Sequence, residues 1–294
     1  MSLPVLREIR VALRHLNPSQ VEALADRPLT FGVLALDEAF FARVISFLIP
    51  DWISDAKAQQ AGRSILRLAS EEDFERSDLG LCEPGLPHPS HFYPFESHDP
   101  MAAVESLLDD HEDLWIPLAR RLPAFRDPVV ERIVWKVSKE NALFTVATAI
   151  PNVVPSWISV PWAIGEFASD TAFLTMNQVR MAFLIAGASD HNIGYQGQRS
   201  QIASIIAAAF GWRSLAREMV SKIPAGGGLV SKGLISLAGT FVVGKGLDTF
   251  MRLGRGLTRQ EKQQIYDQAV ERGRAVVERM AQSVTRKVSA VRSV

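Results

Sequence analysis

Residues 28–48 read PLTFGVLALDEAFFARVISFL, and this stretch decides how the front of the chain folds. The apolar run from Leu29 to Leu36 predicts a buried strand, and the apolar spacing from about Glu38 predicts a helix. In many nucleotide-binding proteins a strand, a short junction and a helix carry the phosphate-binding loop. The residues of the junction therefore decide whether this segment can hold phosphate.

The junction reads Ala-Leu-Asp-Glu, residues 35–38, and it lacks the residues that phosphate binding requires. A phosphate loop uses glycines that let backbone N–H groups approach, a lysine for the terminal phosphates and a Ser or Thr for magnesium. Here Asp37 and Glu38 place carboxylates where phosphate would lie. The sequence therefore predicts no working nucleotide site, no cofactor and no enzymatic activity for this segment.

The composition describes a folded chain of 294 residues, enough for two domains at about 150 residues each. It is 47% hydrophobic with a slightly positive mean hydropathy, which is typical of a large helical core or of membrane contact. The single cysteine excludes an internal disulfide and favours a reducing compartment. Because the start, MSLPVLREIRVALRHLNP, lacks an uninterrupted apolar segment, we expect no secretory signal peptide.

Charge is unevenly distributed along a chain whose net charge is zero. Residues 71–113 hold thirteen Asp or Glu and one basic residue, whereas residues 252–294 hold ten Lys or Arg and four Asp or Glu. Both segments are consistent with solvated surfaces, and the basic end is also consistent with contact to anionic lipid or an acidic partner. We expect no nucleic-acid partner, because the basic end lacks interleaved aromatic residues for base stacking.

The front third of the chain is predicted to form a small α/β domain, residues 1–117. An amphipathic helix is expected over residues 4–16, a second strand over 64–68 and a helix over 101–111. Between them, residues 70–100 are rich in proline, glycine and acidic residues and show no periodicity. We expect a long acidic loop there, of the kind that is usually functional or mobile.

From Leu118 onward the pattern becomes helical, which predicts an α-helical domain over residues 118–294 and an α+β fold class for the chain. Helices are expected after Pro128 and over residues 161–188, 199–210, 212–222 and 230–250. Thr258 and Glu261 fit a capping box that begins a last, basic helix. An apolar stripe on this last helix is predicted from residues three, four or seven apart: Ile265, Ala269, Val276, Met280, Val284, Val288 and Val291.

Four stretches of the helical part carry a family resemblance: LPAFRDPVVERIVWKVSKENALFTVATAIPNVVP, SDTAFLTMNQVRMAFLIAGA, GWRSLAREMVSKIPAGG and LAGTFVVGKGLDTF. With the ordered series Asn141, Asn177-Gln178, Arg213 to Glu218 and Gly239-Thr240, they resemble the bacterial domain of unknown function 697, shared by YcjF-like proteins. The resemblance covers about residues 118–257. It implies a helical, often membrane-associated domain that often follows a Ras-like GTPase domain, and hence a degenerate GTPase-like remnant in residues 1–117.

A stripe of mixed charge lies on the otherwise apolar segment 161–188. At 100° per residue, four of its residues fall within about 80° of one another: Glu166, Asp170, Asn177 and Arg180. A stripe on a buried helix needs internal partners, because unpaired buried charge is costly. We expect an ion-pair network with arginines of neighbouring helices, namely Arg199, Arg213 and Arg217, or alternatively a polar binding cleft. The candidate residues are Glu166, Asp170, Asn177, Gln178, Arg180, Arg213 and Arg217.

Three further motifs have weaker interpretations. GTFVVGKG, residues 239–246, has the spacing of a Walker A loop, but Gly246 replaces the magnesium ligand, so we expect a helix with small residues for close packing. Ser189-Asp190-His191 contains triad residue types, but neighbours in a chain point apart. In the long loop, four residues are weak candidates for a metal such as zinc: Cys82, His88, His91 and His98.

Residues 141–165 form an uncharged run that is long enough for a membrane span, although prolines interrupt this run. Trp157 and Trp162 suit a membrane interface. We expect a non-enzymatic, membrane-associated helical adaptor or regulator on the cytoplasmic side of the bacterial inner membrane, in contact with the membrane surface or membrane proteins. The alternatives are a cytoplasmic module that partners an active GTPase or another protein, and a metal-binding protein that uses residues 82–98. Homo-oligomers remain open.

Overall fold

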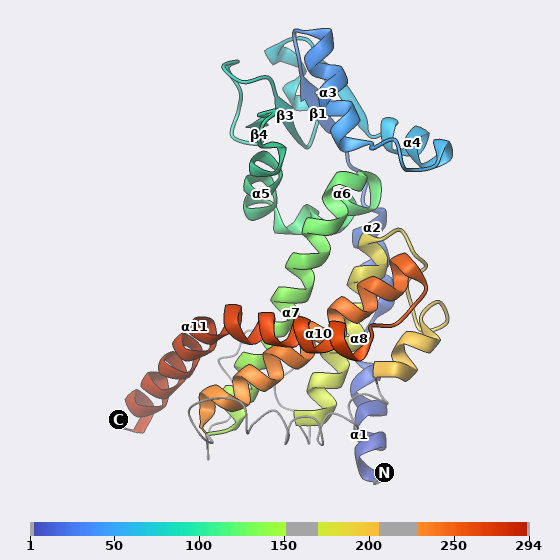
Figure 1. Ribbon diagram of the computed structural model, residues 1–294. Coiled ribbons are helices and arrows are strands. Elements are labelled where there is room, and N and C mark those ends of the chain that lie inside the picture. Colours follow the sequence, from blue (N-terminus) through green and yellow to red (C-terminus); the bar gives the residue numbers. More distant parts are fainter. Residues whose placement is uncertain (1–2, 151–169, 206–227, 293–294) are drawn as a thin grey trace. The chain divides into compact units, whose positions relative to one another are not determined.

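The computed structural model describes residues 3–150, 170–205 and 228–292 (Figure 1). The expected fold class is confirmed: a small parallel sheet with helices is followed by a predominantly helical region. The chain forms two compact units, each discontinuous in sequence. The sheet unit is Ser19–Glu131 with Ala186–Asn192, and the helical unit comprises the remaining residues. The division into domains 1–117 and 118–294 stays a prediction.

Four short strands form the sheet: β1 (Phe31–Leu34), β2 (Ile65–Leu68), β3 (Leu79–Cys82) and β4 (Phe92–Pro94). All neighbouring strands are parallel, in the order β2-β1-β3-β4. The predicted strands at 29–36 and 64–68 are therefore confirmed, and both are shorter than predicted. Because the strands run the same way, the segments that leave them meet at one carboxyl edge of the sheet.

The prediction of a continuous loop over residues 70–100 is wrong, because this segment contains β3, β4 and the 3₁₀ helix η1 (Glu71–Arg76). The strands are only three or four residues long, and Gly80 weakens the strand signal of β3. The sheet nevertheless needs this glycine. A Cβ at Gly80 would lie 2.5 Å from the Phe92 ring, and one at the neighbouring Gly32 would lie 2.6 Å from it. Phe92 thus packs over two strands where side chains are absent.

The helices of the sheet unit are α2 (Pro18–Asp26), α3 (Glu38–Leu48), α4 (Asp55–Gly62), α5 (Pro100–Asp110) and α6 (Trp115–Arg121), with 3₁₀ turns η2 (Glu112–Leu114) and η3 (Pro123–Phe125). The predicted helices from Glu38 and over 101–111 are confirmed as α3 and α5, whereas α2, α4 and α6 were not predicted. Phe40 and Phe47 of α3 pack on Phe95, with ring centroids 6.1 and 5.3 Å away.

The helical unit contains α1 (Leu3–Arg14), most of α7 (Arg126–Thr148) and α8 (Asp170–Ala188), a helical segment at 199–205, α10 (Leu229–Leu253) and α11 (Arg259–Arg292). Their packing is that of a helical bundle. Phe144 of α7 stacks on Phe173 of α8 with centroids 3.8 Å apart, and Trp135 meets Phe241 of α10 edge to face at 5.6 Å. The predictions over 151–169 and 206–227 lie outside the described residues.

Residues 239–246, with their Walker-like spacing, lie inside α10, as predicted. Small residues let this helix approach its neighbours closely. A Cβ at Gly233 would lie 2.6 Å from Val277 of α11, and one at Gly244 would lie 2.6 Å from Val134 of α7. Among the described residues, one helix, α10, is long and apolar enough to cross a membrane. Most of its apolar window is buried inside the protein, as in the core helix of a soluble protein.

The apolar stripe of α11 is centred one residue away from the predicted one. Ile265, Val276 and Met280 are only half-buried. The buried positions are Tyr266, Ala269, Gly273, Val277, Ala281 and Val284. Gly273 makes room for Leu237 of α10, because a Cβ there would lie 2.8 Å from the leucine side chain. The apolar face of α11 is therefore covered by α10.

Candidate functional site

The carboxyl edge of the sheet brings the β1–α3 junction beside the segment that follows β3. In the order β2-β1-β3-β4, the chain moves from β1 outward to β2 and then returns to the other side of β1 at β3. Such a switch point between neighbouring parallel strands is where open α/β sheets bind ligands. Leu36 and Asp37 leave β1 at this point, and Glu83 leaves β3.

The backbone N–H groups at this switch point donate to the protein's own carboxylates. Glu83 Oε2 accepts from the N–H groups of Leu36 at 3.2 Å and Asp37 at 3.4 Å. The side chain of Asp37 caps α3 by accepting from the N–H groups of Ala39 at 3.1 Å and Phe40 at 3.2 Å. A phosphate at this position would need the same donors. The anion position of the strand–helix junction is thus filled by side chains.

The nearby arginine is also engaged. Arg67 of β2 forms an ion pair with Glu38 in the first turn of α3, and its guanidinium lies 4.9 Å from the centroid of the Phe41 ring. Both contacts are on the surface, where ion pairs contribute little to stability. They nevertheless hold Arg67 against α3, so that its charge is balanced by Glu38.

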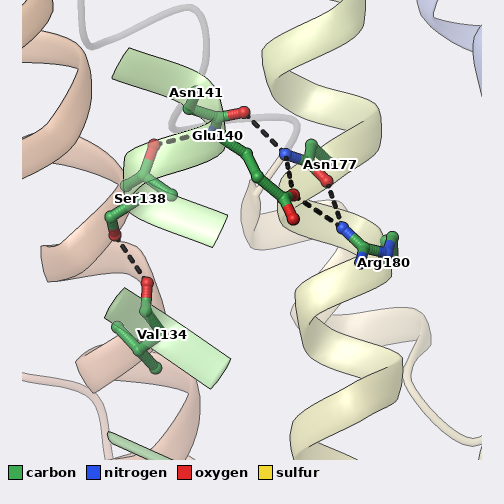
Figure 2. Close-up of polar contacts among 7 residues, drawn as sticks. Val134, Ser138, Glu140, Asn141, Asn177 and Arg180 are labelled. Atoms are coloured by element: carbon green, nitrogen blue, oxygen red, sulfur yellow. Dashed lines mark hydrogen bonds and ion pairs between the residues drawn. The ribbon is translucent and has the colours of Figure 1, made fainter. Parts of the chain in front are cut away.

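A second polar cluster lies between α7 and α8 in the helical unit (Figure 2). The Asn177 amide donates to Asn141 Oδ1 at 2.9 Å and to Glu140 Oε2 at 3.2 Å. Arg180 Nη1 donates to the same Glu140 oxygen at 2.8 Å and to Asn177 Oδ1 at 2.9 Å. Asn141 and Asn177 are fully buried, whereas the side chains of Glu140 and Arg180 are 21% and 14% exposed.

Asn141 extends this cluster to α10. Its amide donates to Thr240 Oγ1 at 2.9 Å, and Gln178 Nε2 approaches the same oxygen at 3.5 Å. The backbone carbonyl of Asn141 accepts from the hydroxyls of Ser236 at 3.1 Å and Thr145 at 2.9 Å. We call these residues the Asn141 network. Because buried polar groups are costly unless they are paired, the network favours one register of α7, α8 and α10.

Some of the predicted polar residues lie together in the structure, but their ion-pair partner is not one of the predicted arginines. Asn177, Gln178 and Arg180 lie together in the Asn141 network. Arg180 pairs with Glu140 of α7, a residue that the sequence reasoning missed, although it is the last charged residue before the uncharged run. Arg199, predicted as an available partner, is exposed. Three candidates and one side chain lie outside the described residues: Glu166, Arg213, Arg217 and the side chain of Asp170.

The four metal candidates are not brought together. Cys82 is buried in β3 beside Leu34 and Leu68, and burial raises the pKa of its thiol to about 12, which disfavours the thiolate that metals bind. His91 meets Phe92 edge to face, and His98 lies 3.8 Å from Glu96. His88 contacts the carbonyl of Pro89. Within 3–150, 170–205 and 228–292, no group of three or more His, Cys, Asp or Glu could hold a metal.

The Ser189-Asp190-His191 segment belongs to the sheet unit and contributes an ion-pair acceptor. Asp190 has left-handed backbone geometry, with φ 58°. Its carboxylate lies 3.5 Å from Lys57 Nζ and 3.7 Å from Arg120 Nη2, while His191 is exposed. The Asp190 carboxylate is therefore oriented towards the positively charged side chains of Lys57 in α4 and Arg120 in α6.

Comparisons with known proteins give no family assignment. No family model matches the chain, and neither the curated proteins nor the solved structures include a match.

Proposed function

We propose that this chain is a non-enzymatic, membrane-associated helical adaptor or regulatory protein, whose front segment is a GTPase-like remnant without a working nucleotide site. One observation carries the proposal: the carboxylates of Glu83 and Asp37 hold the backbone N–H groups at the switch point of the sheet. A nucleotide would have to displace Glu83 and enter a site that also contains Asp37 and Glu38. Repulsion between these carboxylates and phosphate opposes binding.

The resemblance of residues 118–257 to the domain of unknown function 697 supports the helical part of the proposal. Asn141, Asn177, Gln178 and Thr240 carry the resemblance and are up to 99 residues apart in the chain. In space they join one hydrogen-bonded network across α7, α8 and α10. A buried hydrogen-bonded network of this kind favours one particular packing of the three helices.

Membrane association is supported by the charge of the C-terminal segment. Residues 252–294 carry ten basic and four acidic residues. Because the apolar face of α11 packs on α10, we attribute association mainly to charge, with about 1 kcal/mol from each Lys or Arg near an anionic leaflet. The cytoplasmic side of the bacterial inner membrane is a surface of this kind.

Co-sedimentation of the full chain with vesicles tests the proposal. We expect the protein to pellet with phosphatidylcholine vesicles that contain phosphatidylserine, and less so as salt rises, because salt screens exposed charge. Pure phosphatidylcholine is the control. GTP with magnesium should leave the pelleted fraction unchanged. A chain that stays in the supernatant at low salt would refute membrane association. A pelleted fraction that depends on GTP would show that the chain has a working nucleotide site.

The second candidate is a module that binds a partner protein, such as an active GTPase, without touching lipid. It is favoured by the burial of the apolar face of α11 against α10, which is the arrangement of a bundle core. If the chain does not pellet, capture of a GTP-loaded GTPase from native membranes would support this candidate. The metal-binding alternative lacks support from the geometry of Cys82.

A further inference from the structure

A short turn joins α10 to α11 (Figure 1), and the residues at this end of α10 include apolar side chains that are exposed. Leu253, the last residue of α10, is 63% exposed, and Phe250, one turn earlier, is 37% exposed. Gly254 ends the helix in left-handed geometry, with φ 67°, and its N–H donates to the carbonyl of Phe250 at 2.8 Å. We call Phe250–Thr258 the tip.

The tip is held in a defined shape on both sides. Leu257 folds back against α10, because a Cβ at Gly246 would lie 3.5 Å from its side chain. Glu261 and Thr258 close the capping box of α11, and Arg255 pairs with Glu261 at 2.9 Å. Leu253 therefore projects from a turn whose two ends are fixed.

Basic residues flank these apolar side chains in the sequence. Residues 245–262 contain Lys245, Arg252, Arg255, Arg259 and Lys262 against Asp248 and Glu261, a net charge of +3. Both acids are already bound, since Asp248 pairs with Arg252 at 2.6 Å and Glu261 pairs with Arg255. An anionic partner would thus meet an excess of positive charge around Phe250 and Leu253.

We propose that the tip is the surface through which the protein inserts into the headgroup region of anionic phospholipid, with Leu253 and Phe250 entering the acyl boundary. This inference rests on the proposed membrane function and gives it a location. Two exposed apolar side chains are too few for a stable protein interface, which buries about 800 Å² on each partner. They are sufficient for a lipid interface, where insertion and charge attraction act together.

A fluorescent label at position 253 tests the location. Leu253→Cys is labelled with an environment-sensitive nitrobenzoxadiazole group, and Leu36→Cys is the matched control, because Leu36 is 65% exposed on the sheet unit. The native Cys82 is buried, so the wild-type protein should take up no label. With phosphatidylserine-containing vesicles, the label at 253 should brighten and shift to the blue, whereas the label at 36 should not change.

Unlabelled variants measure the contribution of the tip. Leu253→Gln should weaken vesicle binding by about tenfold, the factor expected from partial burial of one leucine, and Leu36→Gln should leave it unchanged. If the full chain pellets but the label at 253 is unaffected, or if the label at 36 responds equally, the tip is not the contact surface although membrane association stands. If the full chain does not pellet, both the location and the membrane function fail.

Discussion

Asp37, Glu83 and Glu261 each accept hydrogen bonds from backbone N–H groups at a helix start or a strand–helix junction. Asp99 does the same at the start of α5, where it accepts from Ala102 at 3.3 Å. The first N–H groups of a helix have no partner within the helix, so a nearby carboxylate satisfies them and complements the helix dipole. At the switch point of the sheet, this common use of acids occupies the position that a phosphate would take.

The capping box of α11 gives a prediction for Glu261. Hydrogen bonds from Arg255 and then from Thr258 lower the pKa of its carboxyl to about 2. Because the folded pKa lies below the usual value of 4.5, the stabilisation is present above pH 4.5 and is lost as pH falls towards 2. An NMR titration of the Glu261 carboxyl carbon should show a midpoint near 2.

The matched variants for this titration are Arg255→Gln and Arg259→Gln. Arg255→Gln should move the midpoint back towards 4.5, since Arg255 makes the largest contribution to the pKa shift. Arg259→Gln removes a neighbouring arginine with the same change of net charge and should move it far less. Equal shifts in the two variants would mean that general charge, rather than the Arg255 contact, determines the pKa.

Asn141 and Asn177 give a second prediction. Asn141→Leu or Asn177→Leu alone leaves buried partners without hydrogen bonds, which should cost about 1–3 kcal/mol of unfolding free energy. The double variant should lose less unfolding free energy than the two single variants together, because the Asn141–Asn177 hydrogen bond can be lost only once. Urea unfolding of the four proteins measures this cycle. Strict additivity would contradict a direct Asn141–Asn177 bond.

At the level of secondary-structure elements, α10 is the helix around which the helical unit packs. It meets α7 at Gly244 and α11 at Gly233, and in both places a methyl group would come within 2.6 Å of a valine. Glycine normally weakens a helix interior by about 1 kcal/mol relative to alanine. In α10 the close approach of the neighbouring helices offsets that cost.

Gly244→Ala and Gly62→Ala test this packing as a matched pair of helical glycines. A Cβ at Gly244 meets Val134 and Met181, so overpacking should lower the unfolding free energy by about 1–3 kcal/mol. A Cβ at Gly62 in α4 meets no atom within 4 Å, so alanine there should be neutral or stabilise by up to about 1 kcal/mol. Thermal unfolding measures both. A Gly244→Ala protein as stable as the wild type would show that α7 and α10 are less closely packed.

The elements differ in how far their sequences predict them. The helix starts at Glu38 and after Thr258 were predicted, because capping and periodicity act over a few residues. β3 was not, since a four-residue strand with a glycine has no clear pattern until Phe92 covers it. The stripe of α11 was displaced because pairs such as Val276-Val277 are apolar at both positions. The Asn141 network joins residues 36 and 99 positions apart, which no local pattern identifies.

At the scale of the whole molecule, each unit uses its conspicuous polar groups internally. In the sheet unit, Glu83 and Asp37 bind the junction where a nucleotide would sit. In the helical unit, Glu140 and Arg180 pair at the rim of the Asn141 network. These polar groups are therefore engaged within their own unit, and the adaptor role that we propose would depend on the surface charge of the basic C-terminal segment.

Calorimetric titration of the full chain with GTP and magnesium tests most directly whether the β1–α3 junction can bind a nucleotide. The Glu83 carboxylate should prevent binding tighter than about 1 mM, an affinity of about −4 kcal/mol, so the titration should show only heats of dilution. Glu83→Lys, which puts a cation beside the N–H groups of Leu36 and Asp37, should bind phosphate groups better than the wild type does. Micromolar binding of GTP by the wild-type protein would contradict the central claim that this sheet has no working nucleotide site.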